Sequence, residues 1–129
     1  MQKTLLITDD ALIIRTMIRD VAVAAGWEVV AEATNGKEAI ESYQQTRPAV
    51  MTLDLVMPEY DGLHALRGIR ELDPDARIVV LSALDQRSVL KEAFRLGASD
   101  FIVKPFDKQA LVATLEQLVA DWAPAATPA

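Results

Sequence analysis

Side chains that could carry out chemistry follow four of the five short apolar runs in this sequence. Asp9 and Asp10 come after the first run, Asp54 after the third, and Ser82 and Lys104 after the last two. If the runs are parallel strands of one open sheet, their carboxyl ends meet at one edge, where such sheets bind ligands. A single polar residue at a loop start is ordinary, but four agreeing strand ends predict a shared site.

Three carboxylates at one edge predict a bound cation, because like charges this close repel one another strongly. Oxygen ligands without a nearby histidine favour Mg²⁺. A metal ion and the Lys104 ammonium can neutralise the oxygens of a phosphoryl group while a carboxylate attacks it in line. Asp54 is the expected nucleophile because it stands alone, whereas the adjacent Asp9 and Asp10 suit direct and water-mediated metal binding. The Ser82 hydroxyl can donate to a phosphoryl oxygen and so sense the modified state.

The elements that must position these residues follow from the hydrophobic pattern. Short β-branched or apolar runs alternate five times with longer stretches whose apolar residues have helical spacing. Strands joined by helical crossovers lie parallel with right-handed connections, which divides the helices between two faces of the sheet. The sequence therefore predicts an α/β domain with a doubly wound five-stranded parallel sheet, its strands at Thr4–Thr8, Glu28–Ala33, Ala49–Leu53, Arg77–Leu81 and Asp100–Val103.

Capping signals predict where the helices begin and end. The first is expected to end at Gly26, and the second to open at residues 34–36, with Glu38 completing a capping box, and to end before Pro48. The others are expected over 62–72, about 85–97, and from 107 onward. The expected buried stripe of the second helix is Ala39, Ile40 and Tyr43, and that of the first is Leu12, Ile13, Met17, Ile18, Val21 and Ala25.

Length and composition narrow the class of protein. The 129 residues, 51% apolar and 25% charged, suit one folded domain and fit neither a disordered chain nor a membrane protein. A net charge of −6 argues against direct nucleic-acid binding, and the absence of cysteine excludes disulfides and cysteine-ligated metals. The N-terminal apolar patch is too short for a signal peptide or a spanning helix, so a cytoplasmic protein without membrane insertion is expected. The Ala/Pro-rich residues 123–129 are expected to form a flexible tail after a domain over 1–122.

Four segments together resemble one known family. Ile7–Asp10, Asp54–Gly62, Leu81–Ala83 and Asp100–Phe106 are similar in type, order and spacing to the motifs of the receiver domain of two-component response regulators, of the stand-alone kind found among chemotaxis regulators. The resemblance covers about residues 4–121. It implies a flavodoxin-like fold with strand order 2-1-3-4-5 and a cis peptide bond before Pro105.

The resemblance also implies roles for the polar residues at the strand ends. Asp54 matches the phosphoacceptor, and Asp10 and Asp54 match direct Mg²⁺ ligands, joined by the backbone carbonyl of Val56. Asp9 matches the acid that acts on the metal through water, and Lys104 matches the lysine that pairs with the phosphate.

Further residues match positions that, in the family, respond to phosphorylation or affect how long the phosphorylated state lasts. Ser82 matches the hydroxyl switch and Phe101 the aromatic switch, so the face expected to change comprises Asp85–Leu96, Asp100–Lys104 and Asp107–Trp122. Val56 and Leu84 match positions that flank the path of the hydrolytic water. Both are apolar and cannot orient a water molecule, so slow self-dephosphorylation is expected.

The function implied is a phosphorylation-dependent signalling switch rather than an enzyme, apart from its own phosphoryl transfer and dephosphorylation. The donor would be a histidine kinase or a histidine phosphotransfer protein, and output would come from docking onto an unknown downstream protein or from pairing of two copies.

Three alternatives stay open at this point. A phosphohydrolase with an aspartate nucleophile would want a second acid where Val56 stands. A flavodoxin-like FMN protein would want a hydroxyl-rich phosphate loop, where Asp9 and Asp10 would repel a phosphate. The chain could also be the receiver fragment of a longer regulator with an output domain.

Overall fold

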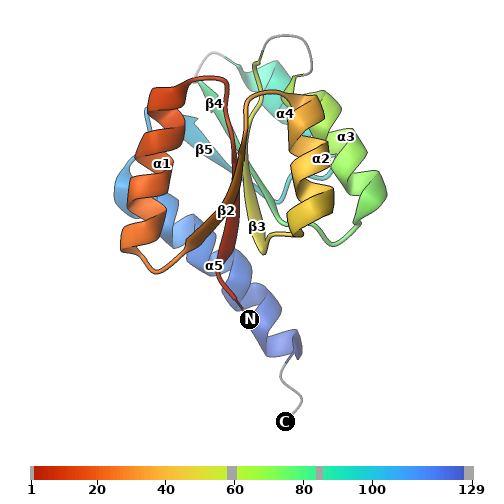
Figure 1. Ribbon diagram of the computed structural model, residues 1–129. Coiled ribbons are helices and arrows are strands. Elements are labelled where there is room, and N and C mark those ends of the chain that lie inside the picture. Colours follow the sequence, from red (N-terminus) through yellow and green to blue (C-terminus); the bar gives the residue numbers. More distant parts are fainter. Residues whose placement is uncertain (1, 58–60, 84–85, 127–129) are drawn as a thin grey trace.

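The computed structural model describes residues 2–57, 61–83 and 86–126, with side chains described up to residue 120. Five parallel strands form one sheet in the order β2-β1-β3-β4-β5, which confirms the predicted topology (Figure 1). β3 and β4 each begin and end one or two residues later than predicted. The strands are β1 (Thr4–Thr8), β2 (Glu28–Ala33), β3 (Val50–Asp54), β4 (Ile78–Ala83) and β5 (Asp100–Lys104).

Helices cover both faces of the sheet, as expected for a doubly wound domain. Figure 1 shows α1 and α5 on one face and α2, α3 and α4 on the other. Alternate residues of the strands pack against the two helical layers, which explains why the central strands are apolar on both sides. The helices are α1 (Leu12–Ala24), α2 (Gly36–Thr46), α3 (Gly62–Leu72), α4 (Arg87–Arg95) and α5 (Lys108–Ala126).

The buried face of α1 differs from the predicted stripe. Leu12 and Ile13 are 66% and 69% exposed, and Met17 is also exposed. Three predicted residues, Ile18, Val21 and Ala25, do pack toward the sheet, together with Ala22 and Ile14, which were not predicted. Helix α1 is apolar around much of its circumference, so helical spacing alone did not define the edge of the buried face. Packing against the sheet leaves Leu12, Ile13 and Met17 outside it.

Capping confirms most of the predicted boundaries. Gly26 has a φ of +91°, the left-handed conformation that glycine adopts after a helix. At the start of α2, Asn35 Oδ1 accepts from the Glu38 amide at 2.9 Å, while the Glu38 carboxylate accepts from the Thr34 amide at 2.7 Å. The expected capping box is thus present with its return bond moved one residue outward.

The end of the chain and the strand-to-helix turn after β5 complete the fold. Helix α5 continues to Ala126, four residues into the segment expected to be a flexible tail. Residues 127–129 lie outside the described residues, and a domain boundary at 122 stays a prediction. The Lys104–Pro105 bond is cis, as the resemblance implied. Across the described part of the chain, no helix has the length and apolar character needed to cross a membrane.

Candidate functional site

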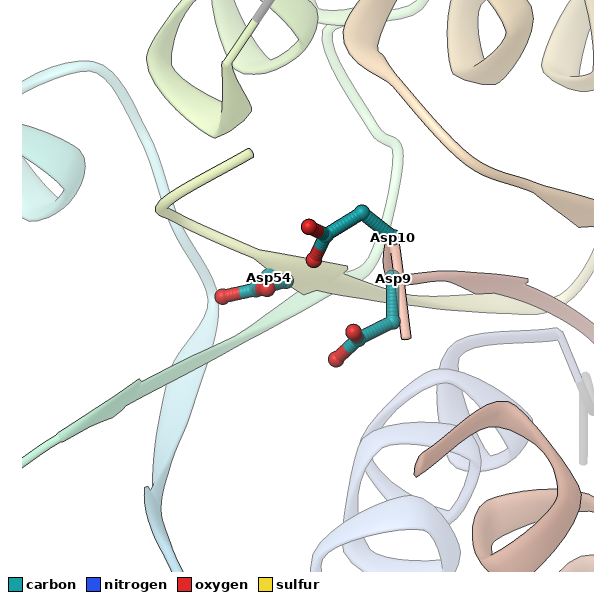
Figure 2. Close-up of side chains that lie close together, drawn as sticks. All are labelled: Asp9, Asp10 and Asp54. Carbon is teal, nitrogen blue, oxygen red and sulfur yellow. The ribbon is translucent and has the colours of Figure 1, made fainter. Parts of the chain in front are cut away.

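The sheet brings three carboxylates together at its carboxyl edge. Asp9 and Asp10 begin the loop after β1, and Asp54 is the last residue of β3, the strand that pairs directly with β1. Their ligand oxygens lie within 4.8 Å of one another (Figure 2). The predicted convergence therefore follows from two neighbouring parallel strands that end at the same height.

A single lysine faces the two buried carboxylates of this group. Asp9 and Asp54 are buried, with Asp54 only 5% exposed, whereas Asp10 is exposed to solvent. Lys104, at the end of β5, places its Nζ 2.9 Å from Asp9 Oδ2 and 3.3 Å from Asp54 Oδ2. One ammonium group thus serves two buried carboxylates, and negative charge remains in excess.

The electrostatics of Asp54 show that excess. Burial, together with the negative charge of Asp9, raises the pKa of Asp54 to about 6, although Lys104 and the Val56 amide act to lower it. Burial alone would lower the pKa of Lys104, but its hydrogen bond to Asp9 and the charges of both acids outweigh burial and raise it. The site therefore holds a charged lysine and a buried carboxylate, that of Asp54, whose charge is only partly compensated.

The donor set fits a hard divalent cation. All three side chains offer carboxylate oxygens, and an ion of charge +2 would offset the remaining negative charge. Both oxygens of Asp9 already accept hydrogen bonds, Oδ1 from the Ala11 amide at 2.9 Å and Oδ2 from Lys104. The exposed Asp10 makes no hydrogen bond or ion pair with the described residues. Asp10 is thus better placed for direct ligation, and Asp9 for ligation through water.

Gly62 supports the end of β3, which carries Asp54, in a way that sequence reasoning missed. A Cβ at this position would lie 2.4 Å from the Asp54 carbonyl oxygen and 2.6 Å from Leu55 Cα. The Gly62 amide donates to the Leu55 carbonyl at 3.1 Å, so the start of α3 lies directly against the end of β3. The sequence placed Gly62 at a helix start and within the motif Asp54–Gly62, but it did not predict this close approach to β3.

The residues expected to respond to phosphorylation lie on the neighbouring strands. Ser82 is buried near the end of β4, one residue beyond the partner of Asp54 in the β3–β4 register. Phe101 on β5 is exposed and packs edge-on against Phe94 of α4, with 5.9 Å between the ring centroids. Val56 is exposed next to the site, and Leu84 lies outside the described residues.

The sequence matches the family model of the response regulator receiver domain over residues 5–116. The chain belongs to this family. Among related proteins, chemotaxis protein CheY of Thermotoga maritima is 45% identical over 118 residues, which cover 92% of this chain and 98% of that protein. This receiver domain therefore matches its relative along almost the whole length of both.

Solved structures agree with the family assignment. The REC domain of AraT, a response regulator from Geobacillus stearothermophilus, matches with a TM-score of 0.89 and 35% identity, covering 98% of this chain and 100% of that one. A chain in the CheX–CheY–BeF₃–Mg²⁺ complex from Borrelia burgdorferi matches with a TM-score of 0.85 and 30% identity, covering 90% of this chain and 88% of that one.

Membership establishes the general function. The chain is a receiver domain, a phosphorylation-dependent signalling switch of a two-component system. The phosphohydrolase and FMN alternatives fit less well. Receiver domains are signalling proteins rather than classical enzymes, they generally use Mg²⁺ at the acidic site, and those of the CheY type interact with histidine kinases and with downstream proteins.

Proposed function

We propose that Asp54 accepts a phosphoryl group from the phosphohistidine of a histidine kinase or phosphotransfer protein. Mg²⁺ would be held by Asp10, Asp54 and the Val56 carbonyl, with Asp9 acting through water. The observation that carries this proposal is the placement of Asp54, a buried carboxylate with an ammonium 3.3 Å away and two acids within 4.8 Å.

The chemistry needs one bond to form and one to break. An Asp54 oxygen attacks the phosphorus, the phosphorus–nitrogen bond to the donor histidine breaks, and an acyl phosphate results. A cation held by Asp10 and Asp54 would offset the charge of the phosphoryl oxygens. Lys104 Nζ already lies beside Asp54 Oδ2, so it can pair with one of these oxygens after little movement.

Intact-mass measurement with acetyl phosphate and Mg²⁺ tests the acceptor. We expect one added phosphoryl group on the wild type, none with EDTA, and none on Asp54→Asn. Asp61→Asn is the matched control, because Asp61 lies near the site and caps α3 through Oδ1, which accepts from the His64 amide at 3.0 Å. Asparagine caps equally well, so this variant should be phosphorylated normally. Uptake that survives Asp54→Asn would contradict the assignment.

Output is proposed to pass from Ser82 to Phe101. Phosphate on Asp54 would draw the Ser82 hydroxyl toward it and free space beside β4, which Phe101 could fill by turning inward. The edge-on contact with Phe94 supports the outward position of Phe101 before phosphorylation. The face that changes would then comprise α4, β5 and α5, and a separate protein or a second copy would bind there.

Amide exchange and partner binding with and without a phosphoryl mimic test this route. Ser82→Ala and Phe101→Ala should uncouple mimic binding from changes at α4, β5 and α5 while leaving phosphorylation of Asp54 intact. Changes confined to α1 and α2, or normal coupling in Ser82→Ala, would show that output takes another route.

Slow self-dephosphorylation is proposed from the residues beside the site. Val56 is exposed and apolar, so it offers no group that could orient a water molecule for attack on the acyl phosphate. Polar substitutions at Val56 and Leu84 should change the decay rate of the phosphorylated protein. An unchanged decay rate in both variants would contradict this proposal.

We also propose the kind of process and the kinds of partner protein in which this receiver domain acts. The relative from Thermotoga maritima is named a chemotaxis protein, and this chain spans nearly all of it. We therefore favour a regulator of chemotaxis type, acting in the cytoplasm between a histidine kinase and a protein target. Phosphorylation-dependent pairing of two copies is the second form of output to be measured.

A further inference from the structure

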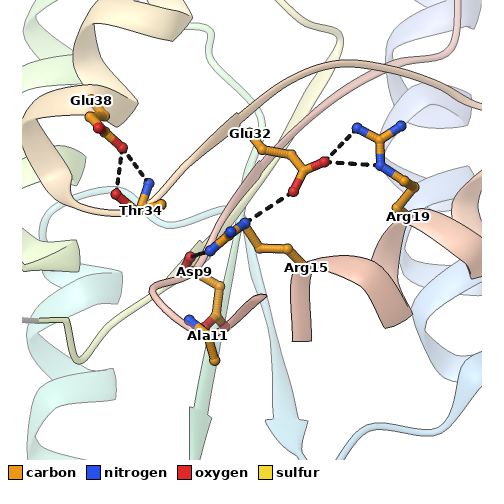
Figure 3. Close-up of polar contacts among 7 residues, drawn as sticks. All are labelled: Asp9, Ala11, Arg15, Arg19, Glu32, Thr34 and Glu38. Carbon is orange, nitrogen blue, oxygen red and sulfur yellow. Dashed lines mark hydrogen bonds and ion pairs between the residues drawn. The ribbon is translucent and has the colours of Figure 1, made fainter. Parts of the chain in front are cut away.

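A charged network joins α1 to the loop that carries Asp9 and Asp10. Arg15 of α1 donates from Nη1 to the backbone carbonyl of Asp9 at 2.7 Å and from Nε to Glu32 Oε1 at 3.0 Å. Glu32 lies on β2 and also accepts from Arg19 Nε at 2.9 Å (Figure 3). The Arg15 side chain is only 12% exposed, so it is held in place rather than extended into solvent.

The carbonyl that Arg15 contacts belongs to the peptide bond between Asp9 and Asp10. Because a peptide unit is planar, fixing its oxygen also fixes its nitrogen and the Cα of Asp10. The Asp10 carboxylate makes no hydrogen bond or ion pair with any described residue, so the backbone alone determines its direction. Asp9 differs, because its side chain has its own contacts to Ala11 and Lys104.

We propose that Arg15, held by Glu32, is a positioning residue for the metal site. It orients the Asp9–Asp10 peptide so that the exposed Asp10 carboxylate points toward Asp54. This inference rests on the Mg²⁺ site of the proposed function. Residues that orient metal ligands commonly affect metal affinity about 10–100-fold.

Charge and positioning predict opposite signs for the loss of Arg15. A guanidinium near three carboxylates lowers their attraction for a cation, so removing its charge alone should tighten Mg²⁺ binding. Loss of positioning should weaken binding, because Asp10 would have to be ordered when the metal binds. The sign of the change in affinity therefore separates the two effects.

Arg19 offers a matched control. It lies one turn further along the same helix, carries the same charge and pairs with the same Glu32, but it makes no hydrogen bond to the Asp9–Asp10 loop. Arg15→Met and Arg19→Met therefore remove equal charge and an ion pair with the same partner. Only the first removes the donor to the Asp9 carbonyl.

The test is calorimetric titration of the unphosphorylated full chain with MgCl₂, alongside thermal unfolding in EDTA. We expect the dissociation constant to rise about tenfold for Arg15→Met and to change less than about twofold for Arg19→Met. Arg15→Lys, which keeps a charge and one donor, should bind Mg²⁺ more tightly than Arg15→Met, and it decides the question if Arg15→Met does not fold. A metal-free readout is the Asp10 amide resonance, which should shift in Arg15→Met and stay unchanged in Arg19→Met.

The outcomes separate this inference from the proposed function. Equal or tighter Mg²⁺ binding by Arg15→Met than by Arg19→Met, with wild type binding normally, would overturn the positioning role alone. Absence of Mg²⁺ binding by the wild type would overturn both. A weaker Arg15→Met with an unchanged Arg19→Met would support both.

Discussion

An aspartate at each end of the sheet has a shifted pKa, and the two shifts have opposite signs. At the amino-terminal end, Tyr43 donates to Asp73 Oδ2 at 2.7 Å, and this hydrogen bond holds the pKa of Asp73 below its usual value despite partial burial. At the carboxyl end, burial and a neighbouring acid raise the pKa of Asp54. The same side-chain type is thus stabilised in its charged form at one end and destabilised at the other.

Arg70 provides further hydrogen bonds at the amino-terminal end. It reaches from α3 and donates from Nη1 to the carbonyls of Pro74 at 2.7 Å and Ala76 at 2.8 Å, and from Nη2 to the carbonyl of Gly97. One side chain thereby ties α3 to the segments that lead into β4 and β5. At the carboxyl end, by contrast, one ammonium group faces two buried carboxylates, and the ionised form of Asp54 is destabilised.

Backbone crowding at the carboxyl end gives the largest expected effect. Gly62→Ala should destabilise the domain by about 3 kcal/mol or more, because its Cβ would meet the backbone of Asp54 and Leu55, which cannot move aside cheaply. Chemical denaturation measures the loss. Gly68→Ala on the same helix is the control, since its Cβ would meet only the end of the Ile40 side chain. If both variants were equally stable, the close approach at Gly62 would not matter energetically.

Removal of the Asp54 charge should stabilise the metal-free protein. A carboxyl pKa of about 6 instead of 3.8 means that the ionised side chain costs up to ~3 kcal/mol at pH 8. In EDTA, Asp54→Asn should therefore raise the free energy of unfolding, measured by urea denaturation, by about 2 kcal/mol. Asp73→Asn at the opposite end should lose about 1 kcal/mol, because its carboxylate is stabilised by Tyr43. Destabilisation by both substitutions would break the comparison.

The raised pKa of Asp54 should also be visible in how the stability of the domain depends on pH. Well above pH 6, Asp54 is ionised in both the folded and the unfolded state, and the full free-energy penalty of burying its charge is present. Between about 6 and 3.8 the native state holds more protons than the unfolded state, so stability rises as pH falls through this window. In EDTA, as the pH falls from 7.5 to 5, we expect the free energy of unfolding of the wild type to rise by about 1 kcal/mol relative to that of Asp54→Asn. Parallel pH profiles for the two proteins would contradict the raised pKa.

The smallest effect concerns the Tyr43–Asp73 bond. Tyr43→Phe should destabilise the domain by about 1 kcal/mol, because the ring stays buried while Asp73 loses its closest donor. The pKa of Asp73 should rise toward its usual value, and NMR titration of its carboxyl carbon would show this. An unchanged pKa would mean that Arg47, 3.7 Å away, is the real source of the shift.

Most of the fold could be predicted from the sequence because the elements are local. The strands were found within two residues, since each is a short apolar run bounded by turn or capping residues. The buried face of α1 could not be predicted, because Leu12 and Ile13 are as apolar as Ile14 and Ile18. Only contact with the sheet distinguishes them.

The candidate site could be predicted in part for the same reason. Asp9, Asp10, Asp54 and Lys104 were found because strand ends in a parallel sheet meet at one edge, and the structure brings these four together. Their proposed roles stay predictions. The supporting role of Gly62 could not be predicted, because it depends on a backbone contact with β3 between elements that the local sequence pattern does not place together.

The position of Asp54 at the end of β3 has a consequence for the timescale on which different parts of the molecule open. Every residue of β3 is buried, and the strand has hydrogen-bonded neighbours on both sides, so its amides should exchange with solvent only when the whole domain unfolds. β5 has a neighbour on one side only and carries the exposed Phe101, so it should open locally and far more often. A covalent mark placed on Asp54 would therefore persist through many fluctuations of the surface that reports it.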